Sequence, residues 1–483
     1  MQWRGLAGAF ALGAAMALGQ APLGVWWVTL PALAGFIWCV ARAARGTFWL
    51  GLFGGAGYVA LALSWIVEPF LIDAAGYGWM APFAVVLLSF GLALFWGAAA
   101  WLSTRARRRA LGFAVALAAA ELARGFVLTG FPWALIGHVW IGTPVDQLAA
   151  YIGPNGLTLL TVLAAALPVA IGWRGGALAL AGLAAVAGAG LARLAEPLPA
   201  NRDVTLRLVQ PNAAQQLKWD ADLAQTHFDR LLALTRTEPL ADLTIWPETA
   251  VPYLFEYSPE VAPMITAASG GRPVILGIQR SEGERFYNAL RVVEQDGREM
   301  ARYDKAHLVP FGEYIPFGDL AGAWFGITAF AAQAGNTYTA GAGPVVLNLG
   351  RFGKVLPLIC YEAVFPQGVN AAPERADWIL QITNDAWFGV WTGPFQHAAQ
   401  ARLRAVEQGL PLVRVANTGV TEVVDAHGRV VAALPFGTSG ALDAALPGAL
   451  PPTPYSRFGE VPVLVLLAGL GALTLRRRRA IAH

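Results

Sequence analysis

The sequence predicts a helical transmembrane bundle joined to a polar α/β domain. Of its 483 residues, 56% are hydrophobic and only 13% are charged, a balance too apolar for a soluble protein. Long apolar runs occupy the two ends of the chain, whereas residues 201–450 have the composition of a soluble domain. In that part apolar strands alternate with helical stretches, which indicates a layered α/β fold.

Eight apolar runs come near the roughly 20 residues that cross a bilayer as a helix. Seven precede the polar domain and one follows it: Leu6–Leu18, Val25–Val40, Thr47–Val67, Trp79–Leu102, Ala110–Thr129, Gly156–Trp173, Ala177–Leu194 and Val461–Leu475. The first resembles a signal peptide in length, but no small-residue cleavage site follows it. We therefore expect a seven-span bundle at residues 1–196, a polar domain at 201–450, and an eighth span with a basic tail at 459–483.

Arginines mark every second loop between these runs. They lie before the first run, in alternate loops and after the last run, at Arg4, Arg42, Arg45, Arg105, Arg107, Arg108, Arg109, Arg174 and Arg476–Arg479. The other loops carry Glu68 and Asp73, or Asp146, with little basic charge. Because basic loops stay in the cytoplasm, both chain termini are expected there and the polar domain on the opposite side.

Two ionisable residues, Glu121 and Arg124, fall inside the fifth run, where such groups are costly. They are three residues apart, so they share one helix face and can pair with each other. A structural ion pair is slightly favoured over a role in substrate binding.

Strands and helices alternate through the polar domain. The expected strands are Val204–Gln210, Ala241–Glu248, Pro273–Gly277, Lys354–Ile359, Trp378–Asp385, Leu412–Ala416 and Thr421–Val424, with a hairpin through Tyr287–Tyr303 and helices at Ala221–Thr235 and Gln396–Gly409. There is no glycine-rich phosphate loop and no cluster of metal ligands. We therefore expect no metal and no other cofactor, and the small net charge of +3 gives no reason to expect a nucleic-acid partner.

Cys360 is one of only two cysteines, and it ends the expected strand Lys354–Ile359. A nucleophile is often presented to a cleft at such a strand end. Taken alone, however, a cysteine in this position is more often a small core residue. The other cysteine, Cys39, lies in an apolar run and is expected to be packing, so no disulfide is expected.

Glu248 and Lys305 also close or follow an expected strand. A thiol attacks a carbonyl as its thiolate, so it needs a base such as a nearby carboxylate to take its proton. A fixed ammonium stabilises the thiolate and then the oxyanion of the tetrahedral intermediate. The three residue types are therefore sufficient for acyl transfer, although strand ends of any α/β domain offer similar residues.

Three motifs make the pattern specific: WPET around Glu248, YDKAHLVPFGEY around Lys305 and ICYE around Cys360. They resemble the catalytic motifs of the nitrilase superfamily, which implies a four-layer α-β-β-α sandwich over residues 201–450. With the eight runs and the segment ELARGFVLTGFPW from Glu121, nearly the whole chain resembles the family of bacterial apolipoprotein N-acyltransferases.

That resemblance implies an acyltransferase of the bacterial inner membrane, with its catalytic domain on the periplasmic side. Such enzymes take an acyl chain from a phospholipid, usually phosphatidylethanolamine, onto the cysteine as a thioester. They pass it to the α-amino group of the S-diacylglyceryl-cysteine that begins a lipoprotein, the last step of lipoprotein maturation. A monomer is expected.

The resemblance also assigns residue roles. Glu248 would be the general base, Lys305 the oxyanion stabiliser and Cys360 the nucleophile. Because the family pattern gives the base to glutamate, a Cys–His pair through His307 ranks below Glu248. Supporting positions map onto Trp219, Asn288, Glu313, Tyr361 and Glu362.

Two other function classes compete. A membrane-anchored amidase or nitrilase-type carbon–nitrogen hydrolase would use the same three residues, but it would need one anchoring span rather than eight. A transporter would explain the spans, but it would usually show intramembrane polar residues along a pathway or symmetric repeats. Only Glu121 and Arg124 stand out in this way.

Overall fold

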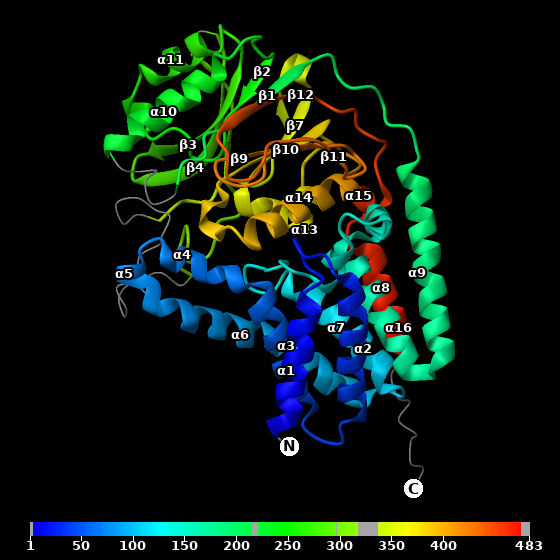
Figure 1. The fold of residues 1–483 in the computed structure, drawn as a ribbon. Helices are drawn as coiled ribbons and strands as arrows, with labels where there is room; N and C mark the ends of the chain where they lie inside the picture. The colour runs from blue at the N-terminus through cyan, green and yellow to red at the C-terminus, as the bar shows by residue number, and fades with distance from the viewer. Residues whose placement is uncertain (1–2, 215–220, 296, 317–336, 475–483) are drawn as a thin grey trace. The chain divides into compact units, whose positions relative to one another are not determined.

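The computed structural model describes residues 3–214, 221–295, 297–316 and 337–474. The chain forms two compact units, which are drawn in Figure 1. The helical unit combines Met1–Glu196 with Thr453–His483, and the sheet unit is Pro197–Pro452.

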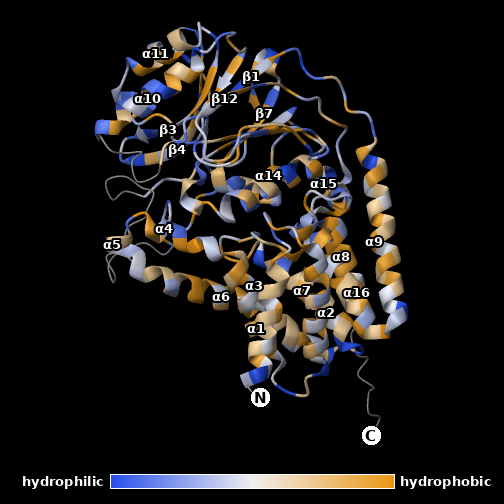
Figure 2. Cartoon of the chain, in the orientation of Figure 1, coloured by the Kyte–Doolittle hydropathy of each residue, from blue (hydrophilic) through white to orange (hydrophobic). Residues whose placement is uncertain are grey.

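Each apolar run predicted from the sequence overlaps a helix of the helical unit. These helices are α1 (Trp3–Ala17), α2 (Trp26–Arg42), α3 (Thr47–Ala62), α6 (Ala81–Leu102), α7 (Arg109–Arg124), α8 (Ala149–Ile171), α9 (Trp173–Leu194) and α16 (Val461–Thr474). Shorter helical pieces connect them: η1 (Ser64–Val67), α4 (Glu68–Leu71), α5 (Ala74–Tyr77), η2 (Gly78–Met80), η3 (Ser103–Arg105), η4 (Ile136–Trp140), η5 (Pro144–Leu148) and α15 (Pro454–Phe458). Figure 2 shows apolar colouring along α8 and α9.

The predicted number of eight spans is not confirmed. Within the described residues, three helical stretches are long and apolar enough to cross a bilayer: Ala74–Arg105, Pro144–Ile171 and Trp173–Leu194. A fourth is added if α3 and the following helix Ser64–Leu71, bent by 67°, count as one span. The apolar helices α2 and α16 are shorter, at 17 and 14 residues.

The fifth run ends earlier than predicted. Its helix, α7, stops at Arg124 rather than Thr129, with Gly125 as its C-cap residue. Leu128 and Gly130, in the segment that follows, have positive φ angles. The chain then turns back, and the Phe131 N–H donates to the carbonyl of Arg124 at 2.8 Å.

Glycines allow α1, α3 and α6 to pack closely. A Cβ atom at Gly57 of α3 would collide with the carbonyl oxygen of Phe10 on α1. A Cβ atom at Gly51, on the same helix, would collide with the carbonyl oxygen of Trp96 on α6. Close backbone approach through small residues is a common way for helices to associate in a membrane.

Glu121 and Arg124 form a buried ion pair, 2.7 Å between Arg124 Nη2 and Glu121 Oε2. The Trp96 indole donates to the same carboxylate at 2.8 Å. Arg124 also donates to the main-chain carbonyls of Phe131 and Trp133, at 2.6 and 2.9 Å. These contacts fasten the segment after α7 to the bundle, which supports the structural role.

We therefore expect Arg124→Leu to destabilise the protein by on the order of 3 kcal/mol, because it leaves the Glu121 carboxylate buried without its partner. The double variant Glu121→Gln with Arg124→Leu removes both charges and should regain part of the loss. Thermal unfolding of the purified protein in detergent measures both effects. A wild-type midpoint for Arg124→Leu would contradict the structural assignment.

In the described residues of the sheet unit, twelve strands form two six-stranded sheets. The first sheet has the order β12-β1-β2-β3-β4-β5, and the second has the order β11-β10-β9-β8-β7-β6. The strands of the first are β1 (Thr205–Gln210), β2 (Leu243–Ile245), β3 (Val274–Glu282), β4 (Arg285–Val293), β5 (Glu299–Asp304) and β12 (Gly440–Ala445). Those of the second are β6 (Leu347–Asn348), β7 (Lys354–Ile359), β8 (Trp378–Thr383), β9 (Leu412–Ala416), β10 (Glu422–Val424) and β11 (Val430–Ala433).

Helices cover the outer face of each sheet. The first is covered by α10 (Ala221–Thr235) and α11 (Val261–Ala268), whose apolar side chains share a core with β1 and β3. The second is covered by α13 (Pro366–Asn370) and α14 (Gly393–Gln408), which pack on β7, β8 and β9. Since β1 contacts β9 and β4 contacts β7, the two sheets face each other. The α-β-β-α sandwich is confirmed.

Strands β6, β11 and β12 were not predicted, and β3 is longer than predicted. Strand β11, VVAA, is short and largely exposed, and β12, GALDAA, is partly buried without a regular apolar and polar alternation. Strand β3 continues through the polar residues Gln279–Glu282 because it forms a hairpin with β4. There the Arg280 guanidinium pairs with Asp304, 2.6 Å between Nη2 and Oδ2.

Candidate active site

Two neighbouring parallel strands bring Cys360 to one edge of the second sheet. Strands β7 and β8 run in register, with Leu358 opposite Gln381 and Ile359 opposite Ile382. The residues after each strand therefore meet at the same edge, which is where sites form in parallel sheets. After β7 that residue is Cys360, and β8 ends at Thr383, followed by Asn384 and Asp385.

Cys360 occupies a strained turn between a strand and a helix. Its φ is +52°, a left-handed conformation that costs a non-glycine residue on the order of 1–3 kcal/mol. The 3₁₀ helix Cys360–Val364 follows at once. A sharp turn of this kind presents a nucleophile at the end of its strand.

Glu362 fastens this turn to the segment that carries Lys305. Its carboxylate accepts the main-chain N–H of Ile359 at 2.7 Å, and those of Ala306 and His307 at 2.8 and 3.0 Å. The Tyr303 hydroxyl donates to it at 2.7 Å. Burial raises the pKa of Glu362, and these hydrogen bonds oppose the rise.

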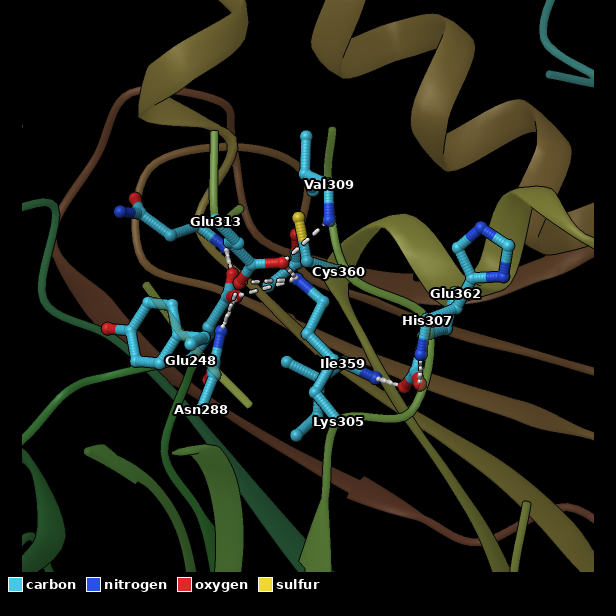
Figure 3. Close-up of polar contacts among 12 residues, drawn as sticks. Glu248, Asn288, Lys305, His307, Val309, Glu313, Ile359, Cys360 and Glu362 are labelled. Carbon is cyan, nitrogen blue, oxygen red and sulfur yellow. Dashed lines mark hydrogen bonds and ion pairs between the residues drawn. The ribbon is translucent and has the colours of Figure 1, made fainter. Parts of the chain in front are cut away.

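Lys305 lies between two carboxylates, those of Glu313 and Glu248. Its Nζ is 2.9 Å from either oxygen of Glu313 and 3.6 Å from Oε1 of Glu248. The Asn288 amide donates to Glu248 at 2.7 Å and to Glu313 at 2.9 Å. Figure 3 shows these side chains converging beside the thiol of Cys360.

Main-chain donors fix the two carboxylates. The N–H of Asn384, at the end of β8, donates to Oε2 of Glu248 at 2.8 Å. The N–H of Val309 donates to Oε2 of Glu313, also at 2.8 Å. Glu248, Lys305 and Cys360 are each no more than 6% exposed, so their charges act on one another in a medium with little screening by water.

These surroundings define the charge states of the resting site. Burial alone would lower the pKa of Lys305, but Glu313, Glu248 and Cys360 raise it above its usual value, so the amine stays an ammonium. Burial and the Glu248 carboxylate raise the pKa of Cys360, against the opposing effects of Lys305 and Thr383. The resting thiol is therefore protonated and needs a base at the moment of reaction.

Tyr361 and His307 lie in an aromatic cluster rather than against the thiol. The His307 ring stacks on Phe365 with centroids 3.8 Å apart, and Tyr361 packs edge-on against Phe365 at 4.8 Å. Figure 3 shows the His307 ring away from Cys360, which disfavours a Cys–His pair. Trp219, the remaining predicted supporting residue, lies outside the described residues.

Comparisons with known proteins identify the family. Residues 205–453 match the family model for carbon–nitrogen hydrolases, and residues 12–167 match that for the apolipoprotein N-acyltransferase N-terminal domain. An apolipoprotein N-acyltransferase of Caulobacter vibrioides is 40% identical, and the match covers 99% of this chain and 95% of that protein. The chain belongs to the apolipoprotein N-acyltransferase family. A second relative of that name, from Bradyrhizobium diazoefficiens, is 38% identical over 100% of this chain and 96% of its own length.

A solved amidase of the nitrilase superfamily, from Nesterenkonia, is similar to part of this apolipoprotein N-acyltransferase family member. It is 18% identical, with a TM-score of 0.41, and the match covers 56% of this chain and 99% of the amidase.

Several residues that hydrogen-bond to the site residues of this apolipoprotein N-acyltransferase family member were not predicted from the sequence. Tyr303 binds Glu362, Asn384 binds Glu248 through its N–H, and Thr383 hydrogen-bonds Cys360. One signal was available: the predicted strand Trp378–Asp385 ends in the polar triplet Thr383-Asn384-Asp385.

Proposed function

We propose that this protein N-acylates the N-terminal S-diacylglyceryl-cysteine of lipoproteins, using a phospholipid as acyl donor and Cys360 as nucleophile. The observation that carries the proposal is the buried set of Glu248, Lys305 and Cys360 in a member of this family. A carboxylate, an ammonium and a thiol together supply a base, an oxyanion partner and a nucleophile.

In the first half of the reaction, Glu248 takes the thiol proton and the Cys360 thiolate attacks an ester carbonyl of the phospholipid. The Lys305 ammonium stabilises the oxyanion that forms. The carbon–oxygen ester bond then breaks, and the lysophospholipid alkoxide leaves with the proton held by Glu248. The products of this step are an acyl thioester on Cys360 and a lysophospholipid.

In the second half, the α-amino group of the diacylglyceryl-cysteine attacks the thioester. Glu248 takes a proton from the amine, Lys305 again stabilises the oxyanion, and the carbon–sulfur bond breaks. The proton passes from Glu248 to the Cys360 sulfur, which restores the resting enzyme. Because the lysophospholipid leaves before the amine reacts, the kinetics are expected to be ping-pong.

Asn288 and Glu313 are proposed to hold the base and the ammonium in place. Asn288 donates to both carboxylates, and Glu313 accepts from Lys305 through both oxygens. Glu362 joins the nucleophile turn to the Lys305 segment, and Tyr361 packs the same turn from its aromatic cluster. Trp219 keeps its proposed supporting role by motif match alone.

Exposed apolar side chains on the site loops support a lipid donor. Phe311, in the loop that carries Glu313, is 59% exposed. Val390 and Trp391, between β8 and α14, are 57% and 77% exposed. Large apolar side chains gathered on the loops of a site are typical of surfaces that contact lipid or protein.

We further propose that residues 1–196 cross the bacterial inner membrane seven times and residues 459–483 an eighth time. The segregation of arginines into alternate loops supports this topology. It places both termini in the cytoplasm and the catalytic domain, residues 201–450, on the periplasmic side. The enzyme is proposed to act as a monomer.

The test incubates purified protein with phosphatidylethanolamine labelled in its acyl chains and with a diacylglyceryl lipopeptide. We expect labelled N-acyl lipopeptide and lysophospholipid in equal amounts, with little free fatty acid. The Cys360→Ala variant serves as the control and should give neither. Free fatty acid formed at the same rate without the lipopeptide would favour the amidase-type hydrolase instead.

A further inference from the structure

A fully buried polar cluster lies behind Cys360 and has no part in the mechanism above. It consists of Asp385, two residues after β8, His397 on α14 and Arg414 on β9, each 0% exposed. Asp385 Oδ1 lies 2.9 Å from His397 Nδ1, and Arg414 Nη2 donates to Asp385 Oδ2 at 2.7 Å. Because burying charged groups is costly, such a cluster calls for a function.

The contacts define how His397 is oriented. Arg414 and His397, acting against the effect of burial, hold the pKa of Asp385 below its usual value, so Asp385 is a carboxylate. Both Asp385 Oδ1 and Arg414 Nη2 lie at Nδ1 of His397, 2.9 and 3.1 Å away, so Nε2 faces the opposite side of the ring. The edge-on ring of Phe388, 5.4 Å away, packs against the imidazole.

On that opposite side, His397 meets the nucleophile residue itself. Its Nε2 lies 3.0 Å from the main-chain carbonyl oxygen of Cys360 and 3.0 Å from the Gln381 amide nitrogen. The Gln381 amide donates to the same carbonyl, also at 3.0 Å. The carbonyl of the strained Cys360 backbone therefore accepts from Gln381 and contacts Nε2 of His397, which holds it when that nitrogen donates its N–H.

We propose that His397, oriented by Asp385 and Arg414, is a positioning residue that fixes the Cys360 carbonyl and thereby aims the thiol at the substrate. The proposal rests on the assignment of Cys360 as nucleophile under the proposed function. His397 touches no reacting atom and exchanges no proton with the substrate.

The same cluster also links the nucleophile to the base. The Thr383 hydroxyl donates to Asp385 at 3.0 Å, and the adjoining Asn384 N–H holds Glu248. A shift of Asp385 would thus move the groups that contact both the thiol and its base. Misplacement of reacting groups by about 1 Å can cost on the order of 10²-fold in rate.

The test compares His397→Leu with the matched variant His427→Leu, because His427 is an equally buried histidine of the sheet unit, 1% exposed, outside this cluster. We expect His397→Leu to lower kcat by about 10²-fold with little change in the KM for phospholipid. Alkylation of Cys360 by iodoacetamide, followed on the Cys360 peptide, should slow in parallel. His397→Gln, which restores an amide donor to the carbonyl, should regain at least about tenfold of the loss, and His427→Leu should stay within about twofold of wild type.

Two results would overturn the proposal: a kcat within twofold of wild type for folded His397→Leu, or equal losses in His397→Leu and His427→Leu. If His397→Leu does not fold, the isosteric variant Asp385→Asn takes its place, and its kcat, KM for phospholipid and rate of Cys360 alkylation are measured instead. Failure of the proposed function would look different, because Cys360→Ala would then retain acyl transfer.

Discussion

Replacing Cys360 by alanine is expected to reduce acyl transfer by on the order of 10⁴–10⁶-fold, the scale for loss of a covalent nucleophile. Alanine fits the space of the small, 5% exposed cysteine, so the fold should persist. The measurement is the rate at which the lipopeptide acquires a labelled acyl chain. Cys39→Ala is the matched control, because Cys39 lies on α2 in the helical unit, and it should keep wild-type activity.

Near-normal acyl transfer by Cys360→Ala would rule out a covalent mechanism through Cys360. Loss of activity in both cysteine variants would point instead to a general effect on the fold. Only loss confined to Cys360 agrees with the proposed role.

Replacing Lys305 by methionine should lower kcat by on the order of 10²–10³-fold, the scale for one group that stabilises an oxyanion. The ammonium is 1% exposed and held by Glu313, so water cannot take its place easily. Lys305→Arg should not restore the rate, because a planar guanidinium does not fit the position of a compact ammonium. The measurement is kcat for both variants at saturating phospholipid.

Lys354→Met is the control for Lys305, because Lys354 is a partly exposed lysine of the same unit, paired with Glu374. It should retain wild-type kcat. Thermal unfolding must accompany these assays, since Lys305→Met leaves two buried carboxylates without their cation. If folded Lys305→Met kept half the activity, Lys305 would have only a structural role.

Glu248, Lys305 and Cys360 could be singled out from the sequence because each closes or follows an expected strand and lies in a motif that resembles the nitrilase superfamily. Glu248 and Lys305 follow β2 and β5 of the first sheet, whereas Cys360 follows β7 of the second, so the facing of the two sheets brings them together. The structure brings the three together with Asn288, Glu313 and Glu362. Their catalytic roles remain predictions.

The contacts of His397 could not be predicted from the sequence, because they are tertiary contacts that no local pattern reports. His397 sits in a helix, and nothing in its sequence neighbourhood shows that its ring reaches Cys360 on another element. Hydropathy likewise counts apolar residues but does not fix where a helix ends. In the fifth run, α7 ends at Arg124, although the apolar composition continues to Leu128.

The central claim, a covalent acyl thioester on Cys360, is tested most directly by mass spectrometry of the intact protein after incubation with phosphatidylethanolamine alone. We expect wild type to gain the mass of one acyl chain, located on the Cys360 peptide and removed by hydroxylamine or by the lipopeptide. The Glu248→Gln variant should gain the adduct far more slowly, because its thiol lacks a base. Wild-type protein that transfers acyl chains without ever carrying the adduct on Cys360 would contradict the account.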